Sequence, residues 1–292
     1  MKVELVKVKT EDGFVLNGAF LEGQQPKNEV PGVDIFMMMH GNGGNFYQDF
    51  YVEFAENFAR MGCPSVRCNN RGHDVINKVV DTFDFRGVAY ELPHECIPDY
   101  RAWIDWLAAQ GFKSIVLWGH SRGAVKTVYY QGHENDFRLR ACIVGSPPWL
   151  SYSRFIKSKR ADDFLEKYRL AQKLVAEGNP NGTFWTDLPT YYVAGAACYL
   201  EKYGPDEKLN IFRYLDKIKC PVLALTGTEE VAHRFAFDDL DKEFDKFARR
   251  MPSLRHVSIP GADHFYTGQK EFVFNAVLDW LKSLQKAPAP VA

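Results

Sequence analysis

The stretch Lys113–Lys126, KSIVLWGHSRGAVK, places one serine between glycines that stand two residues before it and two residues after it. The apolar run Ile115–Trp118 predicts a buried strand before the motif, and Ala124–Gln131 predicts a helix after it. Ser121 is therefore expected on a tight turn from a strand into a helix. Such a turn strains the backbone and crowds the positions two residues on either side, where glycine fits best.

A serine on such a turn has a specific chemical use. Its hydroxyl is a poor nucleophile unless a base takes its proton, so the motif needs a histidine and an orienting acid elsewhere in the chain. The turn also points the first helical amides at the reaction centre, where the amide of Arg122 could stabilise an oxyanion. The alternative is an ordinary turn, because glycine and serine are common residues.

The rest of the chain predicts an α/β fold, a mostly parallel sheet with helices on both faces. Two alternating segments, Val3–Val8 and Phe14–Phe20, are separated by Glu-Asp-Gly and predict a β-hairpin. Short apolar runs then alternate with helical periods, which is typical of strands joined by helical crossovers. The expected strands lie at residues 33–39, 64–68, 114–118, 141–144, 221–225 and 256–259.

One interval lacks a strand pattern, between residue 146 and about residue 212. Apolar residues repeat at helical spacing from Phe164 to Val175, and Tyr191–Tyr203 forms a second helix-like stretch before Gly204-Pro205 ends it. We therefore expect a helical cap inserted over the sheet. The predicted division is a first core segment at 1–145, the cap at 146–212, a second core segment at 213–285 and a disordered tail at 286–292.

A glycine-rich loop upstream is expected at the same edge of the sheet as Ser121. The segment HGNGG, residues 40–44, follows the strand that ends at Met39, and loops after parallel strands face one crevice. Its glycines let a backbone amide approach a substrate oxygen, so the amide of Asn42 is the candidate for a second oxyanion donor. A phosphate-binding loop is disfavoured, because the segment lacks the lysine, the Ser/Thr and the GxGxxG spacing.

The base and the acid are expected on loops after two later strands. His264 stands in PGADHF, after the strand at 256–259, where it could reach back over the sheet. The strand at 221–225 leads into TGTEE, so Glu229 or Glu230 could accept a hydrogen bond from the imidazole. We favour Glu230 and keep Glu229 as the alternative acid. For each residue alone, the plain alternative is a solvated loop side chain.

With these motifs the chain resembles the α/β-hydrolase superfamily over nearly all of its length. The matching segments are HGNGG at 40–44, NRGH at 70–73, GHSRG at 119–123, TGTEE at 226–230 and GADHF at 261–265. The resemblance implies the α/β-hydrolase fold, a helical cap after the strand ending at Val144, and an acid at Glu230, three residues after the glycine of its loop. Most such acids are aspartate, so the glutamate departs from the pattern.

The expected function is that of a serine hydrolase, most simply a carboxylic ester hydrolase that acts through an acyl-enzyme on Ser121. A thioesterase, lactonase, amidase or carbon-carbon bond hydrolase would use the same groups. An acyltransferase, a perhydrolase and a small-molecule receptor without turnover are further alternatives. Five cap aromatics are expected to line an apolar or aromatic pocket: Trp149, Tyr152, Phe155, Trp185 and Tyr191.

Other polar residues near these motifs are expected to be structural. His40 and His120 flank the oxyanion donors, and the resemblance favours a bracing role for both over proton transfer. Arg71, Gly72 and His73 could form a turn at the crevice edge or contact substrate.

Composition narrows the partners. Lysine plus arginine (36) nearly balances aspartate plus glutamate (37), so we expect no nucleic acid or anionic membrane as partner. The start of the chain lacks a secretion signal, no run is long enough to span a membrane, and the six cysteines are scattered, all of which favours a cytoplasmic protein with reduced thiols. No metal or organic cofactor is implied, the expected partner is a small acyl substrate, and homo-oligomerisation is left open.

Overall fold

The computed structural model describes residues 2–78 and 84–286. Within these residues the chain forms an eight-stranded sheet in the order β1-β2-β4-β3-β7-β8-β11-β12. Its strands are β1 (Glu4–Lys9), β2 (Val15–Leu21), β3 (Ile35–Met39), β4 (Ser65–Cys68), β7 (Ile115–His120), β8 (Leu139–Gly145), β11 (Val222–Gly227) and β12 (Leu254–Ile259). β2 pairs antiparallel with β1 and β4, and the remaining neighbours pair in parallel, so the predicted fold class is confirmed.

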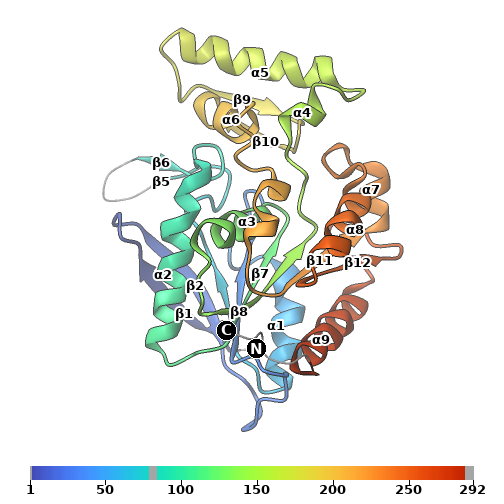
Figure 1. Ribbon diagram of the computed structural model, residues 1–292. Helices are drawn as coiled ribbons and strands as arrows, with labels where there is room; N and C mark the ends of the chain where they lie inside the picture. Colours follow the sequence, from blue (N-terminus) through green and yellow to red (C-terminus); the bar gives the residue numbers. More distant parts are fainter. Residues whose placement is uncertain (1, 79–83, 287–292) are drawn as a thin grey trace.

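Strand β3 shows why helices cover both faces of the sheet. All five of its side chains are buried, and successive side chains of a strand point to opposite faces. Met37 and Met39 pack on one face, whereas Phe36 and Met38 pack on the other. The first face is covered by α2 (Cys96–Ala109), α3 (Arg122–Glu134) and α8 (Leu240–Arg250), and the second by α1 (Val52–Arg60) and α9 (Lys270–Lys286) (Figure 1).

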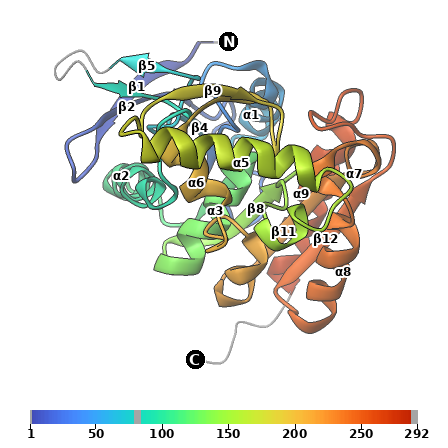
Figure 2. The same cartoon turned by 90° about the horizontal axis from the view of Figure 1, so that it is seen from above.

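The chain leaves the sheet between β8 and β11 and forms a separate layer. This layer contains α4 (Tyr152–Phe155), α5 (Ala161–Ala176), α6 (Ala196–Tyr203) and a two-stranded sheet of β9 (Thr183–Thr186) and β10 (Tyr192–Gly195). Figures 1 and 2 show it over one end of the main sheet, with α5 outermost. That end is where β7 and β8 finish, so the layer covers the loops that carry the candidate site.

The prediction that this interval contains no strand is wrong at β9 and β10. Tyr192 pairs with Thr186 and Gly195 with Thr183, in antiparallel register. Each strand has only four residues, which is too few for an alternating pattern to be recognised in the sequence. The two strands pair with each other across the intervening residues 187–191. The helix-like stretch Tyr191–Tyr203 is therefore a strand followed by α6. The domain boundaries at 145 and 212 stay a prediction.

The cysteines, the end of the chain and the helix lengths bear on three smaller expectations. The six cysteines are free, and five of them are buried. The predicted tail lies outside the described residues except for Lys286, the last residue of α9. None of the helices in residues 2–78 and 84–286 combines the length and the apolar character that crossing a membrane requires.

Candidate active site

Ser121 lies on the turn from β7 into α3, as predicted, and its backbone is in the left-handed region with a φ of 56°. A serine rarely adopts this conformation, so the surrounding structure must hold it there. The two flanking glycines allow the close packing: a Cβ at Gly119 would meet the Gly123 carbonyl at 2.3 Å, and a Cβ at Gly123 would meet the Met39 carbonyl at 2.4 Å. The turn therefore needs glycine at both positions.

His264 meets the serine from the loop after β12. Its Nε2 atom lies 3.0 Å from Ser121 Oγ, within hydrogen-bond distance. A hydrogen bond also fixes the backbone of the loop after β12, because His120 Nε2 donates to the His264 carbonyl at 2.7 Å. His120 therefore braces the loop, which agrees with the structural role expected from the sequence. Burial lowers the pKa of His120 to about 3, so its imidazole stays neutral.

Glu230 lies on the other side of the imidazole, on the short helix α7 (Thr228–His233). Its Oε2 atom is 2.8 Å from His264 Nδ1. Its Oε1 atom accepts hydrogen bonds from the Gly227 amide at 2.8 Å and from Ser146 Oγ at 2.6 Å. The alternative acid, Glu229, points elsewhere: its side chain is half-exposed and lies 3.3 Å from His233. The structure thus joins Ser121, His264 and Glu230 and leaves Glu229 out.

The charges at this site favour a neutral imidazole. Burial and, to a smaller extent, the positive charge of Arg234 together lower the pKa of His264 to about 3. Burial raises the pKa of Glu230 to about 7, opposed by the hydrogen bonds from Ser146 and Gly227. With Nδ1–H donated to the carboxylate, the lone pair of Nε2 faces the serine hydroxyl. This is the state that a general base needs.

The glycine-rich loop lies directly against the nucleophile. A Cβ at Gly41 would stand 3.0 Å from the Ser121 Cβ and 3.4 Å from its Oγ, so the loop backbone borders the reaction centre. His40 braces the loop: its Nδ1 donates to the Gly41 carbonyl at 2.9 Å, and its Nε2 accepts from the Asn70 amide at 3.4 Å. Asn42 follows at the cavity wall. The Arg122 amide is the first of α3 and has no acceptor within the helix.

A cavity of about 1090 Å³ opens above the serine. Ser121 and His264 form its floor, together with the loop residues Gly41 and Asn42. Its apolar walls include Phe50, Tyr191, Phe235, Phe237 and Phe265. The volume is close to the upper end of the usual range of small-molecule sites, so a substrate of moderate size could reach the serine.

Solved structures with the same arrangement of elements exist. Est1E from Butyrivibrio proteoclasticus with bound ferulic acid is similar with a TM-score of 0.66, 17% sequence identity, and coverage of 97% of this chain and 100% of that chain. The α/β hydrolase GrgF from Penicillium sp. sh18 gives 0.67 at 14% identity, covering 97% and 99%. The Pyrococcus furiosus esterase Pf2001 gives 0.61 at 17% identity, covering 97% and 91%. No family model and no curated protein matches the chain.

The chain has the α/β-hydrolase fold.

Four of the five aromatic residues predicted for the pocket of this α/β-hydrolase fold do not line the cavity, and only Tyr191 does. Phe155 is buried between the cap helices, 5.1 Å from the Phe164 ring. Trp149 packs edge-on against Phe212, and Tyr152 against Phe164. Trp185 is 57% exposed and lies edge-on to Tyr191, with 5.6 Å between the ring centroids. Trp149, Tyr152 and Phe155 therefore contribute to packing rather than to the cavity wall.

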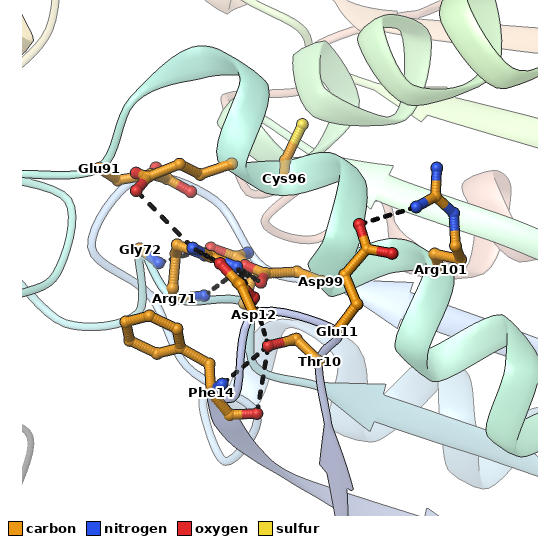
Figure 3. Close-up of polar contacts among 12 residues, drawn as sticks. Thr10, Glu11, Asp12, Phe14, Arg71, Gly72, Glu91, Cys96, Asp99 and Arg101 are labelled. Carbon is orange, nitrogen blue, oxygen red and sulfur yellow. Dashed lines mark hydrogen bonds and ion pairs between the residues drawn. The ribbon is translucent and has the colours of Figure 1, made fainter.

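The NRGH segment is structural in this α/β-hydrolase fold. The Arg71 guanidinium donates to Asp99 at 2.8 and 2.9 Å and to Asp12 at 2.7 Å (Figure 3). This ties the hairpin turn to α2, and Asp99 is fully buried. A Cβ at Gly72 would meet Glu91 at 2.3 Å, so the turn also packs tightly. Among the described residues that line the cavity, neither Arg71 nor His73 appears.

Several residues of the site carry no signal in the sequence. Ser146 and Tyr266 lie beside Glu230, and the Tyr266 hydroxyl is 2.9 Å from Ser146 Oγ. The segment 233–237, which ends α7 and forms the next turn, supplies a whole wall of the cavity. Both features depend on how distant segments meet, so no local pattern marks them. No group of three or more metal-ligating side chains occurs in the part of the chain that the structure describes.

Proposed function

We propose that the chain is a serine hydrolase that cleaves carboxylic esters through Ser121, His264 and Glu230. One observation carries the proposal: the continuous contact from Ser121 Oγ to His264 Nε2 (3.0 Å) and from His264 Nδ1 to Glu230 Oε2 (2.8 Å), at the floor of an open cavity. Nucleophile, base and orienting acid in this order are what acyl transfer requires. The similar Pyrococcus furiosus structure, which is described as an esterase, agrees with the proposal.

In the first half of the reaction, Ser121 Oγ attacks the ester carbonyl and His264 Nε2 takes the hydroxyl proton. The carbonyl oxygen becomes an oxyanion, held by the amides of Asn42 and Arg122. Glu230 stabilises the imidazolium and keeps its Nδ1 proton in place. When the tetrahedral intermediate collapses, the carbon–oxygen bond of the ester breaks and His264 gives its proton to the leaving alcohol. Ser121 is left as an acyl ester.

The second half repeats the chemistry with water. His264 removes a proton from a water molecule, which attacks the acyl carbonyl, and the same amides hold the new oxyanion. The bond to Ser121 Oγ then breaks, and His264 returns the proton to the serine. The carboxylic acid leaves, so one water is consumed for each ester cleaved. Every role in the cycle belongs to a protein group.

The cavity supports a small to medium, largely apolar or aromatic ester. The rings of Phe50, Phe237 and Phe265 border it, and Phe237 lies edge-on to the His264 imidazole with 5.3 Å between ring centroids. An acyl or aryl group that packs against these rings would be transferred from water to an apolar surface, which is favourable.

The test is a panel of p-nitrophenyl esters of rising chain length, with thioester and amide counterparts, assayed on the wild-type protein and on Ser121→Ala. The proposal expects Ser121-dependent hydrolysis, fastest for esters, with a chain-length optimum set by the cavity. Faster turnover of the thioester or the amide would move the assignment to that class. Equal hydrolysis by Ser121→Ala would reject it.

A further inference from the structure

The arginine and lysine residues that line the cavity differ in their partners. Within the described residues, Arg160 lies 3.0 Å from Asp187 and Lys270 lies 3.4 Å from Glu53, so both charges are matched. Arg234 also lines the cavity, but its guanidinium has no carboxylate and no hydrogen-bond acceptor among the residues of 2–78 and 84–286. An arginine offers five N–H donors in a planar fork, and here all of them are free for a ligand.

Arg234 stands at the catalytic end of the cavity. It directly follows α7, and its amide donates to the Glu230 carbonyl at 3.0 Å, so its backbone is one turn from the acid of the triad. After burial, its charge is the strongest influence that lowers the pKa of His264. It also acts on His120 and Glu230. The guanidinium is therefore close to the place where a scissile ester would sit.

The described carboxylates that line the cavity do not pair with Arg234. Glu53 and Asp187 pair with Lys270 and Arg160, and within the described residues neither Asp49 nor Glu271 forms an ion pair with the guanidinium. Asp263, the acid whose charge raises the pKa of His264, is not among the described lining residues. Its Oδ1 accepts the amides of Phe265 and Thr267, both at 2.9 Å, within its own turn. A substrate that approaches Ser121 therefore meets one unpaired guanidinium among the described residues, that of Arg234, on the wall of the cavity.

This cation opposes the reaction unless a ligand neutralises it. His264 must become an imidazolium in the transition state, and a neighbouring unpaired positive charge disfavours that form. A substrate anion bound to the guanidinium would remove the penalty and would also fix the substrate in place. Carboxylate is the anion whose geometry fits the fork of an arginine, with two parallel hydrogen bonds.

We propose that Arg234 binds a carboxylate of the substrate, so that the preferred ester carries a free carboxylate near its scissile bond. This inference rests on the proposed ester hydrolysis and specifies its substrate class. The apolar rings of Phe237 and Phe265 would pack on the carbon chain between the two groups. Arg234 is then a specificity-determining residue, and its effect appears in a comparison of matched substrates.

The experiment compares mono-p-nitrophenyl adipate with its neutral methyl ester, methyl p-nitrophenyl adipate, at low ionic strength. The wild-type protein should show a kcat/KM about tenfold or more higher for the anionic ester, the size of one charge-assisted contact. Arg234→Gln should remove this preference by slowing the anionic ester, whereas the neutral ester should be hydrolysed at least as fast as by the wild-type protein, because the unpaired cation beside His264 is gone. Lys270→Gln makes the same change of charge at a paired cavity lysine and should keep the preference.

The outcomes separate the two proposals. Ser121-dependent hydrolysis of both esters at equal rates, or an equal effect of Arg234→Gln on both, would overturn the carboxylate site and leave the ester hydrolase intact. If neither ester is hydrolysed, the proposed function fails for these substrates, and calorimetric titration with adipate decides the site. Binding that Arg234→Gln weakens about tenfold supports the site, and absent or unchanged binding overturns it.

Discussion

The Nδ1 atom of His264 lies 2.8 Å from Oε2 of Glu230, inside the protein and away from solvent. The acid comes from α7 and the histidine from the loop after β12, and both loops leave the same edge of the sheet. Glutamate is one methylene longer than aspartate, and it reaches the imidazole while its other oxygen is held by Ser146 and Gly227. In the proposed mechanism this contact lets Glu230 position His264, and replacing the acid should have measurable consequences.

Glu230→Gln should lower kcat for a neutral ester by about 10³-fold or more, because an amide in place of the carboxylate favours the wrong imidazole tautomer and does not stabilise the imidazolium. Glu229→Gln is the matched control, since Glu229 is half-exposed and, within the described residues, its one ion pair is with His233. It should stay within about twofold of the wild-type protein. Steady-state kinetics on both variants decide between the acids, and a larger loss in Glu229→Gln would reverse the assignment.

The pH profile should rise with pH and then level off. Activity needs His264 neutral and Glu230 ionised, and burial lowers the pKa of the first to about 3 and raises that of the second to about 7. Both groups reach the active form on losing a proton, so kcat/KM increases as pH rises and the limb has its midpoint near pH 7. Initial rates from pH 4 to 9 with a neutral ester give the midpoint. A rate that falls between pH 6 and 8 would contradict this reading.

Ser146→Ala should move that limb to higher pH. The Ser146 hydroxyl donates to Glu230 Oε1 at 2.6 Å and thereby lowers the pKa of the carboxyl. Without the donor, the pKa of Glu230 rises, and the ionised form needs a higher pH. Ser158→Ala provides the control, since the Ser158 hydroxyl donates to the Phe155 carbonyl in the cap and lies outside the described cavity lining. An unchanged limb in Ser146→Ala would show that the hydroxyl does not tune the acid.

The Arg71 cluster should matter for stability rather than for chemistry. Asp99 is fully buried and accepts two guanidinium hydrogen bonds, so Asp99→Asn should lower the free energy of unfolding by about 3 kcal/mol by leaving the arginine partly unpaired. The nearby pair Arg101–Glu11 is exposed at 2.9 Å (Figure 3), and Glu11→Gln should cost less than about 1 kcal/mol. Urea unfolding of the two variants measures the contrast. Equal losses would contradict the difference in burial.

The core of the site could be predicted because its signals are local. The sequence around GHSRG shows the strand before the turn and the helix after it. The two glycines that allow close packing around Ser121 are part of the motif itself. HGNGG and GADHF likewise follow strands with clear apolar runs. Short segments of sequence decide these turns, since the strained backbone needs particular residues at fixed offsets. The order of parallel strands then brings the loops to one edge.

The cavity walls and the small cap sheet could not be predicted, because they depend on contacts between distant segments. Nothing in TGTEEVAHRFAF indicates that Arg234 and Phe237 face the cavity while Glu229 faces outward. The aromatic residues of the cap are numerous, and spacing does not show that Phe155 points into the cap core. β9 and β10 are too short to show a recognisable strand pattern in the sequence, and they pair with each other rather than with the main sheet.

The central claim is that Ser121 is a nucleophile activated by His264 across 3.0 Å. The most direct measurement is covalent labelling by a fluorophosphonate probe, followed by mass spectrometry of the labelled peptide. Our account predicts that the wild-type protein is labelled on Ser121, that His264→Gln slows labelling strongly, and that Ser121→Ala is folded but not labelled. Failure of the folded wild-type protein to react, or labelling of another residue at the same rate, would contradict it.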